Sequence, residues 1–164
     1  MEIRKASINE LAVVRQLAQE IWPSVYSSII SAAQINYMLD LFYNKETLSQ
    51  DFYKPGYSFF LLNIDGNDSG FAGVEQKDDE TWHLHKIYLS AATRGKGLGK
   101  ILLHHVETFA KNHQAKYMTL NVNRFNKAQF FYQKCGYEIL KEEDIDIGNG
   151  FFMNDFKMRK SLAP

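Results

Sequence analysis

Cysteine is almost absent from this chain, since Cys135 is the only one among 164 residues. A single thiol excludes an intrachain disulfide. With no histidine motif beside it, Cys135 is expected to be a small buried side chain rather than a nucleophile. No apolar run approaches the ~18 residues of a membrane-spanning helix, and no signal peptide is recognisable. We therefore expect a cytoplasmic protein without a membrane partner.

The chain also lacks an excess of charge of either sign. Its 19 basic and 19 acidic residues give a formal net charge of zero, whereas a nucleic-acid-binding surface is usually basic. We therefore expect no nucleic acid among its partners. Internal repeats and low-complexity tracts are absent too. With 45% hydrophobic and 14% aromatic residues at this length, the sequence predicts a single domain over residues 1–164 with a substantial core.

The apolar periodicity predicts an α/β fold with a mixed sheet. A short strand is expected at 2–6, followed by three helices, of which the first should end at Pro23. Later strands are expected at 57–64, 70–76, 81–89, 116–122, 137–147 and 151–160, and later helices at 97–113 and 126–133. Strands 81–89 and 116–122 are joined by a helix, so they should be parallel neighbours.

A glycine-rich segment links the expected strand 81–89 to the expected helix 97–113. It reads Arg94-Gly95-Lys96-Gly97-Leu98-Gly99-Lys100. Glycine tolerates positive φ and lets a ligand approach the backbone closely, and successive free N–H groups can then form a nest for an anion. The N-terminus of the following helix adds further N–H groups and the positive end of its dipole. The segment therefore predicts a cradle for a phosphate or pyrophosphate.

Two better-known phosphate loops do not fit this segment. A Walker A loop needs Gly-Lys followed by Ser or Thr, but Ile101 follows Lys100 here. A dinucleotide fingerprint needs G-x-G-x-x-G and an acid about 20 residues further on, and the stretch 116–120 contains no acid. A flexible connector is the plain alternative, but a connector does not need a strand and a helix directly on either side.

Two motifs at a suitable separation resemble the GNAT superfamily of acetyl-CoA-dependent N-acetyltransferases. Arg94-x-x-Gly97-x-Gly99 resembles its Arg/Gln-x-x-Gly-x-Gly/Ala pyrophosphate motif. The stretch 128–137 (AQFFYQKCGY) resembles its Asn-x-x-Ala-x-x-Phe-Tyr-x-Lys-x-Gly-Phe/Tyr motif. Asn126 precedes the alanine by two positions instead of three, which leaves Asn123 as a second candidate for the asparagine. The order of elements matches along essentially the whole chain.

The resemblance implies a GNAT-like α/β domain in which acetyl-CoA, without a metal, lies in a splay between the two parallel strands. The residues it assigns to the cosubstrate are Ile87, Tyr88 and Leu89 for pantetheine, Arg94, Gly95, Lys96, Gly97, Leu98, Gly99 and Lys100 for pyrophosphate, and also Asn126 and Lys134. Tyr132 would protonate the departing thiolate, because a phenol with a pKa of about 10 is neutral at pH 7. A packed aromatic side chain is the alternative for Tyr132.

The reaction implied by this resemblance also needs a base. An alkylammonium acceptor has a pKa near 10 and must lose a proton before it attacks the thioester carbon. Glu75 and His85 on the expected central strands are the candidate catalytic bases. By strand alternation, His83 and Ile87 should share the face of His85. A chain of water molecules without a single base is an equally good alternative.

The acceptor is expected to be a small-molecule amine. Residues 21–26 (IWPSVY), 33–39 (AQINYML) and 146–155 (DIGNGFFMND) resemble the PaiA-type spermine/spermidine acetyltransferases, which implies a polyamine. The acids of 141–146 and Asp155 would suit a polycation, and Asp146 and Asp155 are better candidates than Glu142 and Glu143, which should face solvent. Trp22 and Tyr26 are candidates to line the substrate pocket. A solvated strand face and ordinary core packing are the respective alternatives.

Other functions remain open at this point. The acceptor could be a protein N-terminus, a lysine or an amino sugar, and the protein could be a sensor that binds acyl-CoA without turnover. Since members of the superfamily often pair through sheet edges or C-terminal strands, the resemblance also makes a homodimer an expectation to be tested.

Overall fold

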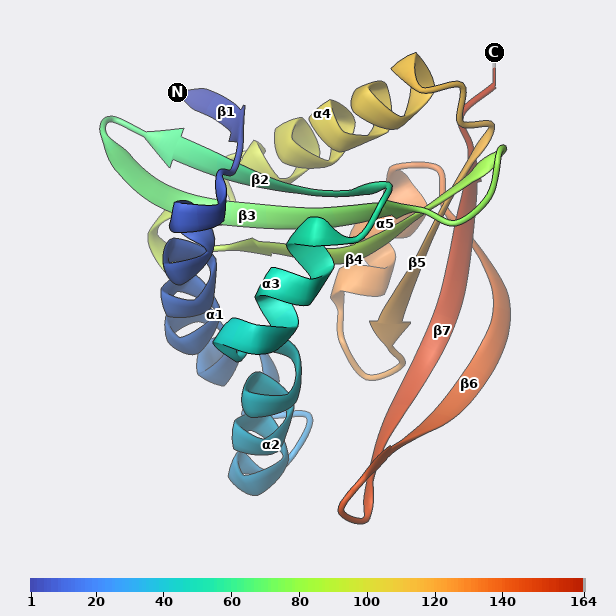
Figure 1. Ribbon diagram of the computed structural model, residues 1–164. Coiled ribbons are helices and arrows are strands. Elements are labelled where there is room, and N and C mark those ends of the chain that lie inside the picture. Colours follow the sequence, from blue (N-terminus) through green and yellow to red (C-terminus); the bar gives the residue numbers. More distant parts are fainter. Residues whose placement is uncertain (164) are drawn as a thin grey trace.

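A computed structural model describes residues 1–163 of the chain and shows one seven-stranded mixed sheet with helices on both faces (Figure 1). The sheet order is β1-β2-β3-β4-β5-β7-β6. The strands are β1 (Glu2–Lys5), β2 (Tyr57–Ile64), β3 (Asn67–Gln76), β4 (Thr81–Leu89), β5 (Tyr117–Asn123), β6 (Glu138–Gly148) and β7 (Phe151–Ser161). The helices are α1 (Leu11–Tyr26), α2 (Ala32–Tyr43), α3 (Lys45–Tyr53), α4 (Leu98–Asn112) and α5 (Ala128–Lys134), with short 3-10 turns η1 (Ile8–Glu10) and η2 (Ala91–Thr93).

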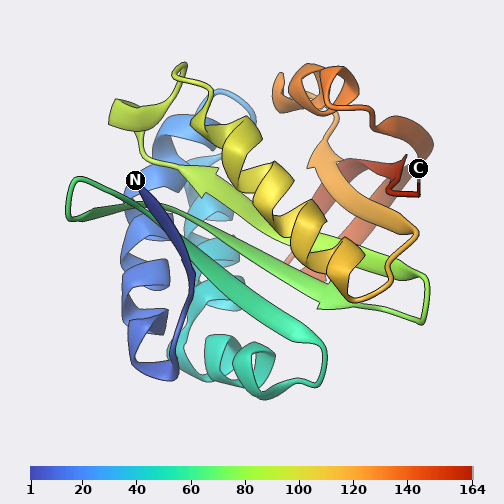
Figure 2. The ribbon, with the colours of Figure 1, turned by 90° about the horizontal axis from the view of Figure 1, so that it is seen from above.

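The helices bury both faces of the central strands. Helices α1, α2 and α3 cover one face, and α4 and α5 cover the other (Figure 2). In β2, Phe59 and Leu61 pack under α1–α3, whereas Phe60 and Leu62 pack under α4. The alternation of a strand thus supplies two separate cores, one on each face of the sheet.

The one parallel pair opens into a fork, as expected. Strands β4 and β5 pair only from Thr81 opposite Tyr117 to Leu84 opposite Leu120. Beyond these residues β4 stays with β3, and β5 stays with β7. Figure 1 shows the two strands diverging toward their carboxyl ends. Open α/β sheets bind ligands at this end of their parallel strands, so the fork is where a ligand is expected.

A bulge in β4 corrects the predicted facing of its side chains. Gly73 of β3 pairs with Lys86, but the next residue of β3, Val74, pairs with Leu84, so His85 is an extra residue in the ladder. A bulge reverses the alternation beyond it. His85 therefore contacts His83 on the side of α1–α3, while Ile87 packs on the opposite side with the α4 core. The expectation that His83, His85 and Ile87 share one face is wrong.

The expected element boundaries differ from the observed ones most clearly at Pro23. Helix α1 continues through this proline to Tyr26. The rings of Trp22 and Tyr26 lie 4.6 Å apart, and Trp22 also packs 5.7 Å from Tyr88 of β4. These tertiary contacts hold the last turn in helical form although proline removes one hydrogen bond.

Candidate functional site

The fork between β4 and β5 opens into a cleft of about 870 Å³. Helix α1, the loop before α4 and the start of α5 form the rest of its wall. Most residues that the sequence assigned to acetyl-CoA line it, together with the expected acid: Ile87, Tyr88, Leu89, Arg94, Gly95, Gly97, Gly99, Lys100, Asn126 and Tyr132. The structure thus brings two motifs that lie far apart in the sequence to one cavity.

The glycine-rich loop presents unpaired donors to this cleft. Within the described residues, the backbone N–H groups of 95–100 donate no hydrogen bond, and the first helical bond of α4 runs from Ile101 to the carbonyl of Gly97 at 3.3 Å. Gly95 and Gly97 have φ of 75° and 76°, in the left-handed region that favours glycine. Free N–H groups in succession at a helix N-terminus fit a pyrophosphate.

Arg94 has a structural role in addition to its charge. Its guanidinium donates to the carbonyl of Leu89 at 3.1 Å and to Ser24 Oγ of α1 at 3.0 Å. The loop is therefore tied both to the end of β4 and to the N-terminal helices. These contacts hold the start of the glycine-rich loop in position.

Three residues assigned to the cosubstrate do not line the cleft. Leu98 packs into the α4 core, while Lys96 and Lys134 are exposed to solvent. Leu98 turns inward because the first turn of an amphipathic helix must bury its apolar side chain. Lys134 lies on the exposed side of α5, whereas Ala128, Phe131 and Tyr132 of the same helix line the cleft.

Asn126 lies at the end of the cleft where α5 begins. Its Oδ1 accepts a hydrogen bond from the N–H of Ala128 at 2.9 Å, which orders the entry to the helix. Asn123, the other candidate for the motif asparagine, instead lines a second cavity and accepts from the N–H of Phe125. The placement in the cleft therefore favours Asn126.

Tyr132 combines burial with access to the cleft. It is 8% exposed, and its hydroxyl has no hydrogen-bond partner among the residues that the structure describes. Burial raises the pKa of this phenol well above its ordinary value, and the neighbouring Tyr26 adds to the increase. The hydroxyl is therefore protonated at neutral pH and free to donate a proton or a hydrogen bond into the cleft.

A second cavity of about 350 Å³ meets the cleft on the side of α1 and α2. Both cavities are lined by Tyr26, Leu84, His85, Lys86, Tyr88 and Asn121, so they join at the bulge and the fork. The second cavity, called the acceptor pocket from here on, extends between α2 and the β6–β7 hairpin. Its outer part is apolar and is lined by Ile30, Met38, Phe42, Ile145, Phe152 and Met153.

Aromatic side chains form the inner wall of the acceptor pocket. Trp22, Tyr26, Tyr43 and Tyr88 all line it, and the Tyr26 and Tyr88 hydroxyls are 2.8 Å apart. Burial raises the pKa of Tyr26 to about 12, so both phenols stay neutral. Trp22 and Tyr26, the expected substrate residues, therefore line the pocket. They also pack against each other, so both the pocket and the core-packing expectations hold for them.

The opposite wall carries two acids joined by an amide. Asn121 Nδ2 donates to Glu143 Oε2 at 2.8 Å and to Asp155 Oδ2 at 3.4 Å. Burial raises the pKa of Asp155 to about 6, although the Asn121 hydrogen bond opposes this, and the charge of Glu143 raises it further. The pocket therefore holds one anion readily and a second at a higher pH.

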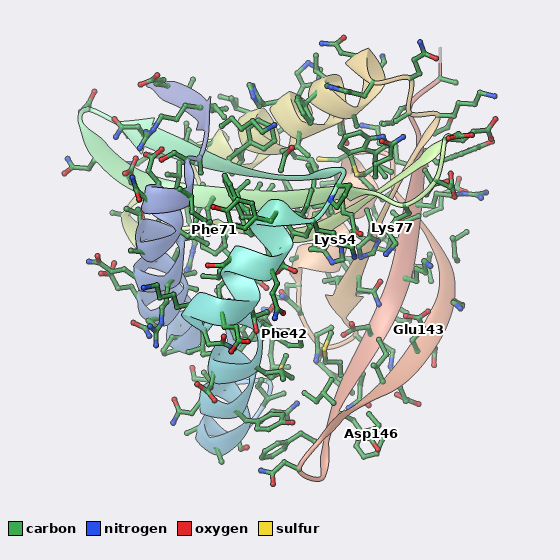
Figure 3. All side chains as sticks on the ribbon, viewed as in Figure 1. Phe42, Lys54, Phe71, Lys77, Glu143 and Asp146 are labelled. Carbon is green, nitrogen blue, oxygen red and sulfur yellow. The ribbon has the colours of Figure 1, made fainter. Side chains whose placement is uncertain are left out.

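Asp146 is not where the sequence placed it. Its side chain is exposed near the tip of the β6–β7 hairpin and bonds to the N–H of Gly148, whereas Glu143 points into the pocket (Figure 3). Alternation along β6 turns Glu143 and Ile145 inward and Asp144 and Asp146 outward. The preference for Asp146 over Glu143 was wrong, whereas Asp155 does line the pocket, and Glu142 is exposed as expected.

The two candidate bases, His85 and Glu75, are hydrogen-bonded to each other. His85 Nε2 lies 2.7 Å from Glu75 Oε2. Burial would raise the pKa of Glu75, but hydrogen bonds from Lys54 and His85 outweigh it and lower the pKa to about 2. Glu75 does not line either cavity, but His85 lines both. His85 is therefore accessible from the cavities, whereas Glu75 lies behind it.

Sequence reasoning missed Asn121 and Lys86. Asn121 is an isolated polar residue between the apolar Leu120 and Val122 of a buried strand, and that interruption was the available signal. Lys86 is a cation in the central strand β4, with its ammonium 5.2 Å from the Tyr43 ring centre. Burial lowers the pKa of Lys86, and Asp51 opposes this decrease.

The fork, the glycine-rich loop and the tyrosine of α5 together define an acyl-CoA-dependent transferase. Comparison with known proteins agrees: residues 13–137 match the model of the acetyltransferase (GNAT) family. The chain belongs to this family and is an acetyl-CoA-dependent N-acetyltransferase. Acetyl-CoA is its cosubstrate and supplies the acetyl group as a thioester.

Particular relatives cover nearly the whole chain. Spermidine N(1)-acetyltransferase of Thermoplasma acidophilum is 30% identical over 158 residues, which are 93% of this chain and 95% of that protein. The crystal structure of PaiA N-acetyltransferase from Thermoplasma acidophilum in complex with coenzyme A has a TM-score of 0.82 and 28% identity over 98% of each chain. Aminoglycoside 6'-acetyltransferase type Ii shares the fold alone, with a TM-score of 0.69 and 18% identity over 100% of this chain and 99% of that one.

The structure adds two findings about residues 1–163. None of their helices has the length and apolar character needed to cross a membrane. In the same residues, no group of three or more histidine, cysteine, aspartate or glutamate side chains is placed to hold a metal ion.

Proposed function

We propose that this protein transfers the acetyl group of acetyl-CoA to a primary amine of a polyamine such as spermidine or spermine. The observation that carries the proposal is the environment of Asp155. This carboxylate is 4% exposed, lines the acceptor pocket and forms no salt bridge with any described residue. A buried carboxylate without a cation is costly, and the ammonium group of a ligand would supply the missing charge.

The distribution of charge fits an amine with more than one nitrogen. The reacting nitrogen belongs at the junction of the two cavities, where the thioester is delivered. A second ammonium would then lie against Asp155 and Glu143, deeper in the acceptor pocket. The apolar outer wall suits the methylene segments of such a chain, because methylenes gain free energy on leaving water. The 30% identity to a spermidine N(1)-acetyltransferase supports the same substrate class.

The chain's own residues would divide the work on acetyl-CoA. The N–H groups of 95–100 would hold its pyrophosphate, and the unpaired edge of Ile87, Tyr88 and Leu89 would hold its pantetheine. Tyr132 would donate its proton to the sulfur as the C–S bond breaks. We assign these roles because Gly95, Gly97, Gly99 and Lys100 of the loop line the same cleft as the end of β4 and Tyr132.

The test is release of free thiol from acetyl-CoA with spermidine, spermine, putrescine, butylamine, an aminoglycoside and a lysine peptide. We expect the highest kcat/KM with spermidine or spermine. Transfer to another amine, with no transfer to either polyamine, would refute the substrate class and leave the acetyltransferase intact.

A matched pair of variants tests the ammonium subsite itself. Asp155→Asn should raise the KM for spermidine about 10- to 100-fold, because a hydrogen-bonded charge contributes roughly 1.5–3 kcal/mol, with a smaller effect on butylamine. Glu142→Gln, on the exposed side of β6, should leave both KM values unchanged. An equal effect of Asp155→Asn on spermidine and butylamine would show that Asp155 does not bind the second ammonium.

A further inference from the structure

Glu75 and His85 form a hydrogen-bonded pair, and His85 lies at the junction of the two cavities. Glu75 belongs to β3 and is 4% exposed, and its Oε2 lies 2.7 Å from His85 Nε2. The bulge in β4 brings His85 to this side of the sheet, where its side chain remains 31% exposed. His85 therefore bridges a buried carboxylate and the space in which the substrates meet.

The carboxylate determines which ring nitrogen of His85 carries the proton. Glu75 is held ionised by Lys54 Nζ at 2.5 Å and Lys77 Nζ at 3.6 Å. These two lysines directly follow α3 and β3. An ionised carboxylate can only accept hydrogen bonds, so Nε2 of His85 must donate. In the neutral ring, Nδ1 then carries the lone pair, and no described residue hydrogen-bonds it.

Packing and charge keep the ring neutral and fixed. It stacks on Tyr57 with ring centres 5.4 Å apart and meets the edge of His83 at 4.6 Å. Burial lowers the pKa of His85 to about 4, although Glu75 opposes this, and the nearby Lys86 and Lys77 lower it further. The imidazole is therefore neutral at pH 7, and the lone pair of Nδ1 is available to accept a proton.

We propose that His85 Nδ1 takes the proton from the acceptor nitrogen during acetyl transfer, and that Glu75 is a positioning residue that fixes the tautomer and orientation of the ring. As the nitrogen forms its bond to the acetyl carbon, its N–H proton passes to Nδ1. The C–S bond breaks, and the sulfur receives a proton from Tyr132. The proton on His85 then leaves through solvent, and Tyr132 regains one, so the protein returns to its starting state.

Other groups at the pocket are less suited to this step. His83 Nδ1 already lies 2.7 Å from Thr119 Oγ1, and burial lowers the pKa of His83 to about 3. Glu75 lines neither cavity, and its two lysines and His85 occupy both of its oxygens. Of the two bases suggested by the sequence, His85 is thus the proposed base and Glu75 its positioning residue.

Kinetic measurements on variants of His85 and Glu75, with a variant of another buried carboxylate as control, distinguish a loss of catalysis from a loss of stability. We expect His85→Gln to lower kcat about 10²-fold, the usual contribution of general base catalysis, without a change in acetyl-CoA affinity. Glu75→Gln should fall between this variant and the wild type. Glu107→Gln removes an equally buried carboxylate, bonded to Lys160 at 2.9 Å and Tyr137 at 2.8 Å, and should lower stability with little effect on kcat.

Two further readouts respond to the proposed roles alone. Added imidazole should restore turnover to His85→Ala and have no effect on Glu107→Gln. Long-range ¹H–¹⁵N spectra of the wild type should show His85 as the Nε2–H tautomer, and Glu75→Gln should shift it toward a mixture. A wild-type Nδ1–H tautomer, or a kcat for His85→Gln equal to that of the wild type, would overturn the proposal.

This inference depends on acetyl transfer to an amine and not on the polyamine assignment. The kinetic assays therefore use the amine with the highest rate in the substrate panel. A panel that excludes polyamines refutes the substrate class alone, whereas an unaffected His85→Gln refutes the base alone.

Discussion

Replacing Asp155 by asparagine is predicted to stabilise the ligand-free protein at neutral pH while it weakens substrate binding. Burial is the main reason that the pKa of Asp155 rises from 3.8 to about 6 on folding. Between these values the folded protein binds more protons than the unfolded chain. The stability therefore falls as pH rises through this window and stays low above it.

The size of the effect follows from the same shift. A difference of about two pH units corresponds to about 3 kcal/mol at pH 7 and above, as an upper value. Asparagine carries no charge, so the variant should gain up to this amount at pH 7.5. At pH 4.5 Asp155 is mostly protonated in the folded protein but mostly ionised in the unfolded chain, so about 1 kcal/mol of the difference should remain, and it should vanish only well below the unfolded pKa.

Urea denaturation at pH 4.5, 6.0 and 7.5 measures the difference, with Glu142→Gln as the control on the exposed side of β6. We expect the gain of Asp155→Asn to grow over this range and the control to follow the wild type. Spermidine at pH 7.5 should raise the midpoint of the wild type more than that of Asp155→Asn. A variant less stable than the wild type at pH 7.5, or a gain that does not vary with pH, would refute the reasoning.

Three further substitutions test other parts of the site. Tyr132→Phe should lower kcat by about 10²-fold with unchanged calorimetric affinity for acetyl-CoA, and an unchanged kcat would remove the phenol from the reaction. Gly97→Val should abolish acetyl-CoA binding because φ is 76° there, and intact affinity by calorimetry would refute the cradle. Gly148→Ala should raise the KM for the acceptor but not for acetyl-CoA, since the new Cβ would lie 2.7 Å from the Tyr37 hydroxyl at a φ of 87°; equal KM values would show that the hairpin tip does not shape the pocket.

The glycine-rich loop and the cleft beside it were largely predictable from the sequence because their signal is local. The glycine-rich loop lies between a strand and a helix that adjoin it, so φ, free N–H groups and the helix dipole all follow from neighbouring residues. The parallel pairing of β4 and β5 followed from the helix between them. Leu98 packs into the core and Lys134 is exposed, although both belong to the matched motifs. For these two residues, the side of the helix on which they lie determines their surroundings.

The acceptor pocket was harder to predict because its residues meet through pairing between strands. The bulge at His85 depends on how β4 registers with β3, which no pattern within 81–89 reveals. Asn121, Glu143 and Asp155 come from three strands whose register brings them together. A correct choice between Asp146 and Glu143 required knowing which side chains of β6 point toward the pocket. The pairing of β6 with β7 determines this.

The β6–β7 hairpin lines the acceptor pocket but not the cleft between β4 and β5. Its tip rests on α2 through two hydrogen bonds, from Tyr37 to the carbonyl of Ile147 at 2.5 Å and from Gln34 to the carbonyl of Phe152 at 2.7 Å. The family match ends at Tyr137, one residue before this hairpin begins. Glu143, Ile145, Phe152, Met153 and Asp155 of the hairpin line the acceptor pocket beside residues of α1, α2, β4 and β5. A change confined to the inner face of the hairpin would therefore alter one wall of this pocket and leave the glycine-rich loop as it is.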